Sequence, residues 1–318
     1  MERIVFGPVP SRRFGQSLGI NNIFSPKRCS YSCIYCQIGR TLIYEIERKE
    51  FYKVEDIKKQ VKEVIENLKG KKIDYISFVP DGEPTLDINL GKEIEILKEF
   101  GIKIAVITNS SLIWRKDVRD DLKKADCVSL KIDAVSVAIW KKINRPNKKI
   151  NLESILEGIQ IFSEEFKGQL LTETLFIKDI NDSKEEIEKI GEFIKKIEPE
   201  IAYIGYPTRP PAEKWVKIPE KEKIDFAYIV FKSKNLNVKI IEKKEEREFG
   251  FTGDLVEDIL SIVSVHPMSE KEIKKFVKDN RGSFDLVKSL IDRGEIVEVE
   301  YMGEKYYRRN LNKWKNMM

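Results

Sequence analysis

The sequence predicts an α/β protein in which a partial (β/α)6 TIM-like barrel precedes a small winged-helix domain. Short, almost continuous apolar runs rich in Val and Ile alternate with longer amphipathic stretches, which is typical of parallel strands covered by helices. Six such units before Pro207 fit an incomplete barrel better than a small doubly wound sheet. After Thr252 the pattern changes to three short helices and a hairpin, which indicates a winged helix.

The apolar and amphipathic runs place each element of the first part. The strands are expected at residues 17–23, 73–79, 102–108, 127–132, 169–177 and 201–206. The helices between them are expected to include residues 54–68, 89–100, 151–166 and 184–197. Prolines then break a linker-like segment, after which residues 220–232 read as a helix and residues 238–241 as a short strand.

The segment after residue 252 has its own start and stop signals. Ser269 followed by Glu272 is a capping box that opens a helix. Ser283 can cap the next helix, and Gly294 ends it. Residues 296–301 and 305–309 then flank a tight turn and form a hairpin. We expect this segment to bury a small core of its own.

A run of charge separates the two parts. Residues 242–248 are almost all charged, so they are expected to form a solvated connector. The predicted domains are therefore residues 1–248 and residues 252–312. Lys+Arg and Asp+Glu are equal in number over residues 252–318, which gives no overall basic surface for nucleic acid.

The composition of the whole chain narrows the class of protein. Lys+Arg is 58 against Asp+Glu 53, a net charge of +5, which is compatible with nucleic acid but does not demand it. Abundant Lys and Glu with a single His is typical of thermophile proteins. No apolar stretch is long enough to cross a membrane, and no secretory signal is visible. We expect a cytoplasmic protein whose thiols are reduced.

Cysteine spacing indicates a metal centre. Cys29, Cys33 and Cys36 form a C-x3-C-x2-C group, while Cys127 stands alone in a predicted strand and is expected to be buried core. Three thiolates suit a 4Fe–4S cluster with one iron left open. A zinc knuckle with a distant fourth ligand is the alternative, although structural zinc normally takes four close ligands. The single histidine, His266, is expected at a surface or turn.

The cysteine group and a second motif together resemble a known family. C-x3-C-x2-C with Tyr35 before the last cysteine is similar to the signature of radical S-adenosylmethionine (radical SAM) enzymes. The loop after the second predicted strand reads Asp-Gly-Glu-Pro over residues 81–84, which resembles the family's GGEP motif with Asp81 in place of its first glycine. The resemblance covers roughly residues 1–215.

This resemblance implies cofactors and a set of site residues. It implies a 4Fe–4S cluster on the three cysteines, with S-adenosylmethionine (SAM) on the open iron and an electron donor of the flavodoxin or ferredoxin type. It assigns the amino group of SAM to Gly82, Glu83 and Pro84. It suggests Asn109, Lys131 and Asp133 as contacts to the ribose or carboxylate of SAM, with strand capping or a solvated rim position as the plain alternative.

A narrower resemblance concerns the substrate. Residues 7–13, 36–41 and 208–211 look like a subgroup related to wyosine synthases, which modify tRNA. The wyosine enzymes carry a second cluster on three further cysteines, and only Cys127 remains here. The resemblance thus implies tRNA or another anionic substrate without implying the wyosine reaction. Contacts to that substrate, or simple surface ion pairs, are expected at Ser11, Arg12, Arg13 and Arg209.

The function expected from the sequence is reductive cleavage of SAM to a 5′-deoxyadenosyl radical that abstracts hydrogen, with RNA modification as its setting. The alternative is an iron–sulfur redox sensor that binds nucleic acid through the winged helix. A SAM loop around Glu83 separates these two functions, because a sensor needs no SAM site.

Overall fold

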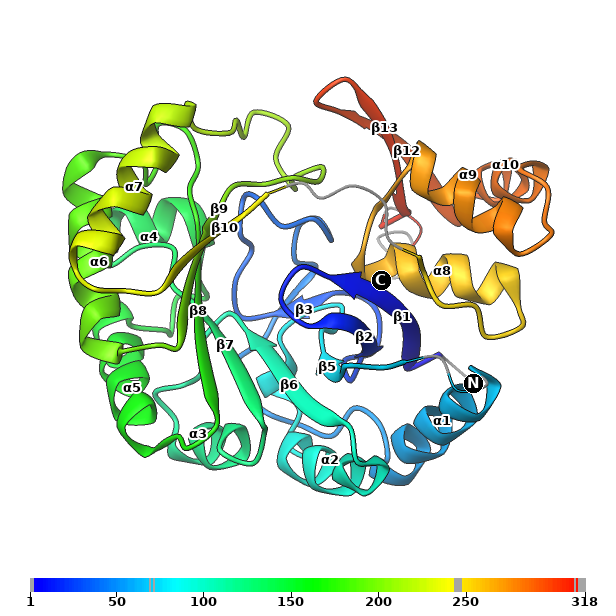
Figure 1. Ribbon diagram of the computed structural model, residues 1–318, viewed down its shortest axis with the longest axis horizontal. Coiled ribbons are helices and arrows are strands. Elements are labelled where there is room, and N and C mark those ends of the chain that lie inside the picture. The colour runs from blue at the N-terminus through cyan, green and yellow to red at the C-terminus, as the bar shows by residue number, and fades with distance from the viewer. Residues whose placement is uncertain (1–2, 69, 71, 243–247, 312, 314–318) are drawn as a thin grey trace.

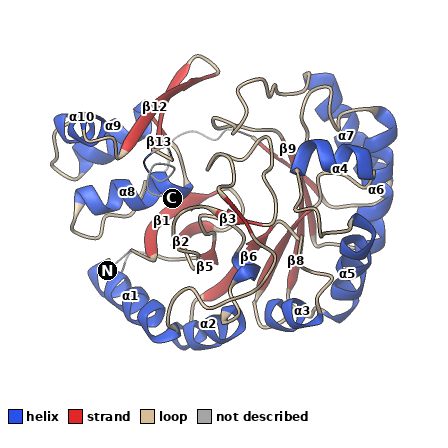
Figure 2. Ribbon diagram, turned by 180° about the vertical axis from the view of Figure 1, so that it is seen from behind, coloured by secondary structure: helices blue, strands red, loops and turns tan. Residues whose placement is uncertain are grey.

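The computed structural model describes residues 3–68, 70, 72–242, 248–311 and 313 (Figure 1). Its main feature is a curved sheet with helices along the outer side, and a smaller helical unit lies beside the first strand (Figures 1 and 2). No described helix is long and apolar enough to cross a membrane. The chain is an α/β protein with a mostly parallel sheet.

The large sheet fixes the edge where a site can form. Its strands lie in the order β1 (Val5–Ser11), β2 (Gly15–Ile20), β5 (Tyr75–Phe78), β6 (Lys103–Thr108), β7 (Cys127–Lys131), β8 (Gln169–Leu175), β9 (Ile201–Gly205) and β10 (Val238–Ile241). β1 is antiparallel to β2, and all the other neighbours are parallel. The carboxyl ends of the parallel strands therefore meet at one edge, where the loops that follow them converge.

Helices connect the parallel strands. They are α1 (Val54–Asn67), α2 (Leu90–Leu97), α3 (Lys116–Leu122), α4 (Val137–Asn144), α5 (Leu152–Glu165), α6 (Lys184–Ile197) and α7 (Lys221–Ser233). Short elements β3 (Arg28–Cys29), β4 (Ile43–Tyr44), η1 (Pro84–Leu86) and η2 (Lys98–Phe100) lie in the loops. The apolar faces of the helices and the sheet share one large core.

The strands and helices predicted from the sequence are confirmed, with shifted ends. The helix over residues 184–197 is found at those bounds, because Ser183 caps it by accepting a hydrogen bond from the Glu186 N–H. The prediction lacks β1, α3 and α4, as well as the short elements β3, β4, η1, η2 and β11 (Met268–Ser269). β1 contains Pro8 and Pro10, and proline is tolerated only on an edge strand such as this one.

Residues 249–311, here called the C-terminal unit, contain three helices and a small sheet among the described residues. The helices are α8 (Leu255–Val265), α9 (Glu270–Asp279) and α10 (Asp285–Asp292). The sheet has the order β11 (Met268–Ser269), β13 (Glu304–Arg309), β12 (Ile296–Tyr301). Residues 243–247 of the predicted connector lie outside the described residues.

Local signals in the C-terminal unit are largely confirmed. Ser269 Oγ accepts from the Glu272 N–H at 3.2 Å, and Glu272 Oε2 accepts from the Ser269 N–H at 2.7 Å, which completes the capping box. The hairpin turns at Met302 and Gly303, whose φ angles of 51° and 74° suit a two-residue turn. The third helix begins after Ser283, whose Oγ accepts from the Asp285 N–H.

The apolar core of the C-terminal unit is not its own. Phe6 and Val9 of β1 belong to the same buried cluster as Ile259 and Ile262 of α8. Gly250 also packs directly on Pro8, because a Cβ at that glycine would meet the Pro8 ring at 2.1 Å. The expectation of a self-contained core is therefore wrong, since the first strand of the large sheet completes it.

Candidate active site

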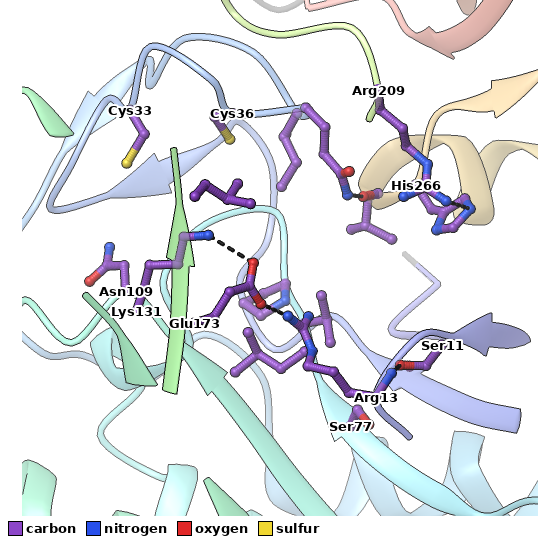
Figure 3. A pocket seen from close by; sticks show the side chains of 18 of the residues that line it. Ser11, Arg13, Cys33, Cys36, Ser77, Asn109, Lys131, Glu173, Arg209 and His266 are labelled. Atoms are coloured by element: carbon purple, nitrogen blue, oxygen red, sulfur yellow. Dashed lines mark hydrogen bonds and ion pairs between the residues drawn. The ribbon is translucent and has the colours of Figure 1, made fainter. Parts of the chain in front are cut away.

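A cavity of about 340 Å³ opens at the carboxyl edge of the sheet, between the cysteine loop and the C-terminal unit (Figure 3). The size is in the range of small-molecule sites. Of the residues proposed from the sequence, those that line it are Ser11, Arg12, Arg13, Cys29, Cys33, Cys36, Gly82, Glu83, Asn109, Lys131 and Arg209. Pro84 and Asp133 do not line it. Segments far apart in the chain thus meet at one site, as the parallel topology requires.

The cysteine loop follows β2 and is wound by its own backbone. The Cys36 N–H donates to the Cys33 carbonyl at 3.1 Å, and the Gly39 N–H donates to the Cys36 carbonyl at 3.0 Å. Gly39 has a φ of 107°, which side-chain-bearing residues rarely adopt. These turns bring the three thiols to one side of the cavity.

Each of the three thiols accepts one hydrogen bond from a different side chain. The pairs are Asn109 Nδ2 to Cys29 Sγ at 3.2 Å, Asn144 Nδ2 to Cys33 Sγ at 3.4 Å, and Lys27 Nζ to Cys36 Sγ at 3.1 Å. Such donors stabilise a thiolate and orient a metal ligand. In the metal-free protein, burial raises the pKa of Cys29 to about 11 and that of Cys33 to about 12.

Three thiols are one ligand fewer than structural zinc takes, and they suit a 4Fe–4S cluster with one iron left open. Within the described part of the chain, no three Cys, His, Asp or Glu side chains gather closely enough to hold one metal ion. Zinc requires four such ligands at about 2 Å. A four-iron cluster takes one thiolate per iron, so its ligands stand farther apart. The cysteine loop thus offers three thiol ligands, one for each of three irons of such a cluster.

The loop after β5 is shaped by close backbone contact. A Cβ on Gly82 would lie 1.8 Å from the Arg28 carbonyl oxygen, so only glycine fits beside the cysteine loop. The Glu83 N–H donates to the same carbonyl at 3.2 Å. Asp81, which stands where the family has glycine, is fully buried and forms an ion pair with Arg309 of β13.

Glu83 is buried and held at the wall of the cavity. Its Oε1 accepts from Thr108 Oγ1 at 2.6 Å and from Thr85 Oγ1 at 2.7 Å, while its Oε2 accepts from the Asn109 N–H at 2.8 Å. Burial raises its pKa, although these hydrogen bonds oppose the shift. A carboxylate has about four acceptor positions, so Oε2 retains room for a further donor such as an ammonium group.

The three polar residues at the ends of β6 and β7 differ in what they contact. Asn109 is committed to Cys29 and Ser30, so it orients the cysteine loop. Asp133 is 3% exposed and accepts from Asn144 Nδ2 at 3.0 Å and from the Tyr35 hydroxyl. Because Asp133 does not line the cavity, its contacts place it behind Tyr35 rather than beside a ligand.

Lys131 does face the cavity and is part of a chain of charges (Figure 3). Its Nζ forms an ion pair with Glu173 Oε1 at 2.8 Å, and the other oxygen of Glu173 pairs with Arg13. Burial lowers the pKa of Lys131 to about 8. Sequence reasoning missed Glu173, although an acidic residue between two threonines inside a predicted barrel strand is itself a signal for a polar interior.

The remaining predicted substrate contacts are of two kinds: Ser11 shapes a turn, while Arg12 and Arg209 bring positive charge to the cavity. Ser11 Oγ accepts from the Phe14 N–H at 3.1 Å and thereby shapes the turn between β1 and β2. Arg12 Nη2 donates to Thr208 Oγ1 at 2.6 Å. Arg209 Nη2 lies 2.7 Å from His266 Nε2, which belongs to the C-terminal unit and lines the cavity. His266 does lie at the end of α8, as expected, but it also faces the cavity and contacts Arg209.

Comparison with known proteins identifies this arrangement. The sequence model of the Radical SAM superfamily matches residues 23–194, which include the cysteine loop and the Glu83 loop. The chain belongs to the radical SAM superfamily. Members of this superfamily use a 4Fe–4S cluster and SAM, and the donor set described above fits both.

Relatives extend beyond the matched region. A "UPF0026 protein MJ1312" of Methanocaldococcus jannaschii is 49% identical over 311 residues, which is 97% of this chain and 96% of that protein. A "Dual-specificity RNA methyltransferase RlmN" of Buchnera aphidicola is 27% identical over 248 residues, 73% of this chain and 66% of that protein.

One solved structure shows the same fold at low identity. A radical SAM methyltransferase from Sphaerobacter thermophilus aligns with a TM-score of 0.56 and 14% identity, covering 71% of this chain and 65% of that chain.

Proposed function

We propose that this chain is an enzyme that reductively cleaves SAM and uses the resulting 5′-deoxyadenosyl radical to abstract hydrogen from RNA. The observation that carries the proposal is the convergence of the three hydrogen-bonded thiols and the buried Glu83 on one cavity. When bound, the cluster supplies the single electron that cleaves the S–C5′ bond of SAM. A redox sensor would need no carboxylate held at this place.

The chain's own residues divide the work of binding SAM. Glu83 binds the methionine ammonium, and the backbone of Gly82 and Pro84 shapes that pocket. Lys131 neutralises the carboxylate of SAM, because it faces the cavity while its partner Glu173 is shared with Arg13. Asn109 orients Cys29, and Asp133 positions Tyr35 at the edge of the cysteine loop.

We further assign the two parts of the fold. Residues 1–248 form a partial (β/α)6 barrel with β1 and β10 added at its edges, and residues 252–312 form a winged-helix domain. The helices α8 to α10 and the β11-β13-β12 sheet support the second assignment. Val265 and His266 of this domain line the cavity, which favours a role as one wall of the site.

RNA is the substrate class that agrees best with the surroundings of the cavity. The chain resembles RNA methyltransferases over most of its length, and its motifs at residues 7–13, 36–41 and 208–211 resemble those of the wyosine-related, tRNA-modifying subgroup. Arginines line the cavity on the side opposite the thiols. A reductant of the flavodoxin or ferredoxin type is the required electron donor.

The test uses the cluster-loaded full chain under strict anaerobiosis. We expect 5′-deoxyadenosine to form from SAM with a strong reductant, and to form faster when total tRNA is added. Mass spectrometry of the tRNA nucleosides should then show a mass change that depends on SAM. A fully loaded protein that produces no 5′-deoxyadenosine contradicts the enzymatic function.

A further inference from the structure

We propose that Arg12 and Arg209 form a subsite for a phosphoryl group of the substrate, where the β1–β2 turn meets the C-terminal unit. The inference rests on the proposed function and adds to it the place where the substrate is held. Both arginines line the same cavity as the cysteines. They reach it from distant parts of the chain, Arg12 after β1 and Arg209 after β9.

In the part of the chain that the structure describes, no carboxylate contacts either of these two arginines. Arg13, next to Arg12 in the chain, is different because it pairs with Glu173. The carboxylate of Glu272 acts on both arginines only at longer range, since it is held by the capping box at Ser269.

The two guanidinium groups are held in place by neutral acceptors. Arg12 donates to Thr208 Oγ1 at 2.6 Å and to the Glu242 carbonyl at 3.4 Å. Arg209 Nε donates to the Pro267 carbonyl at 3.2 Å. These contacts use only part of the five N–H donors of each arginine. The groups are therefore fixed in position while donors remain for a ligand.

The hairpin of the C-terminal unit holds the loop that carries Arg209 through two hydrogen bonds. The Tyr301 hydroxyl donates to the Pro207 carbonyl at 2.9 Å, and the Tyr306 hydroxyl donates to the Thr208 carbonyl at 3.4 Å. A subsite assembled from β1, the loop after β9 and the C-terminal unit forms only when all three are docked.

The arrangement fits a phosphoryl group better than other anions. Two positive charges confined together repel one another, and burial with this repulsion lowers the pKa of Arg209 to about 10. A terminal phosphate monoester, as at the end of an RNA strand, is a dianion and relieves the repulsion more than a monoanion such as a carboxylate or an internal phosphodiester. Guanidinium groups also match the several oxygens of a phosphate through paired hydrogen bonds. A carboxylate offers one charge and two oxygens.

His266 reports directly on the occupancy of this subsite. Arg209 has no acceptor atom, so it donates to His266 Nε2, which must be unprotonated. Burial and the charges of Arg209 and Arg12 lower the pKa of His266 well below its ordinary value. The ring of Phe249 packs on its other side and carries no charge. A bound dianion offsets the two positive charges, so it raises the pKa of His266.

The experiment uses the cluster-loaded full chain and inorganic phosphate as the probe. Calorimetry gives the phosphate affinity, and NMR follows the imidazole protons of His266, the only histidine in the chain. We expect saturable binding that moves the His266 signals. Arg12→Gln and Arg209→Gln should each weaken phosphate binding at least fivefold, while Arg12→Lys should weaken it less. Arg293→Gln, at an exposed position of the C-terminal unit, is the matched control and should change nothing.

Further binding measurements identify the type of anion that the subsite prefers and the molecule that supplies it. Acetate should bind at least tenfold more weakly than phosphate, and equal affinity would exclude the phosphoryl assignment. A nucleoside 5′-monophosphate and a short single-stranded RNA are then compared as competitors. Displacement of phosphate by either supports the subsite and names the source, and displacement by neither overturns it.

The outcomes also separate this proposal from the proposed function. Unchanged phosphate affinity in folded Arg12→Gln protein, or saturation that leaves the His266 signals in place, overturns the subsite even if SAM is cleaved. If the protein binds phosphate with these properties but cleaves no SAM, the subsite is supported and the proposed enzymatic function is rejected. Circular dichroism confirms folding, and should Arg209→Gln fail to fold, the Arg12 variants decide the result.

Discussion

Arg309, on the last strand of the C-terminal unit, forms an ion pair with Asp81, the residue directly before Gly82 and Glu83. Arg309 also contacts Ser25 at the start of the cysteine loop. Asp81 is the one position at which this loop differs from the family's GGEP motif. In the structure its carboxylate is the partner of Arg309. These contacts connect the C-terminal unit to the two loops that carry the candidate cofactor residues.

Arg309→Gln should destabilise the protein strongly, because it leaves the buried carboxylate of Asp81 without its guanidinium. We expect the free energy of unfolding to fall by about 3 kcal/mol, measured by urea denaturation. Adding Asp81→Asn should recover part of this loss, since the uncompensated charge is then gone. Lys288→Gln, which breaks an exposed pair with Asp285, is the control and should change stability by less than about 1 kcal/mol. Equal losses in the two single variants would contradict the buried ion pair.

Cys33→Ala should abolish stable cluster binding. Anaerobic reconstitution of the parent protein should give about four irons per chain, and the variant should lose them. Cys127→Ala is the matched control, because Cys127 is a fully buried core residue of β7 and should keep the iron. Iron and sulfide analysis checks both. Full iron content in Cys33→Ala protein would show that the ligand assignment is incorrect.

Glu83→Gln should weaken SAM binding while leaving the cluster in place. The substitution removes the negative charge that binds the ammonium but preserves the shape that Thr85 and Thr108 hold. We expect at least a tenfold loss of SAM affinity, equivalent to about 1.4 kcal/mol, by equilibrium dialysis of cluster-loaded protein. Glu63→Gln, at an exposed position of α1, serves as the control. Unchanged affinity with normal iron content would remove Glu83 from the SAM site.

The free energy of unfolding should decrease as the pH is lowered below about 6.5, because of His266. The folded protein keeps this ring neutral, with a pKa well below the ordinary value of 6.5, so only the unfolded chain takes up the proton in this range. Between pH 7.5 and pH 5.5 this one group should remove about 1.4 kcal/mol from the free energy of unfolding. The measurement compares urea denaturation of the parent and His266→Gln proteins at both pH values. The same pH dependence in both would show that His266 is protonated in the folded state.

The candidate cofactor residues can be proposed from the sequence because their motifs are local. Cys29, Cys33 and Cys36 lie within one loop and point to a cluster by their spacing, and Gly82 and Glu83 lie within another loop that resembles a family motif. The helix over residues 184–197 is also predicted from local signals, because its capping residue and its apolar stripe are both visible in the sequence.

What the sequence does not predict depends on distant contacts. Glu173 is the one acid of β8, and its role appears only when Lys131 of β7 and Arg13 of the β1–β2 turn approach it. His266 looks like a turn residue until Arg209 is placed against it. β1 is disfavoured locally by its prolines, and it becomes a strand because β2 and α8 cover its two sides.

Because Phe6 and Val9 share a core with α8, the chain has a fixed order of assembly during translation. The first strand leaves the ribosome early, and its apolar partners follow only after the whole large sheet has been made. Until then one side of β1 stays uncovered and the cysteine loop lacks its Arg309 contact. Newly made protein therefore lacks the wall of the cavity that Val265 and His266 supply until the last helices dock.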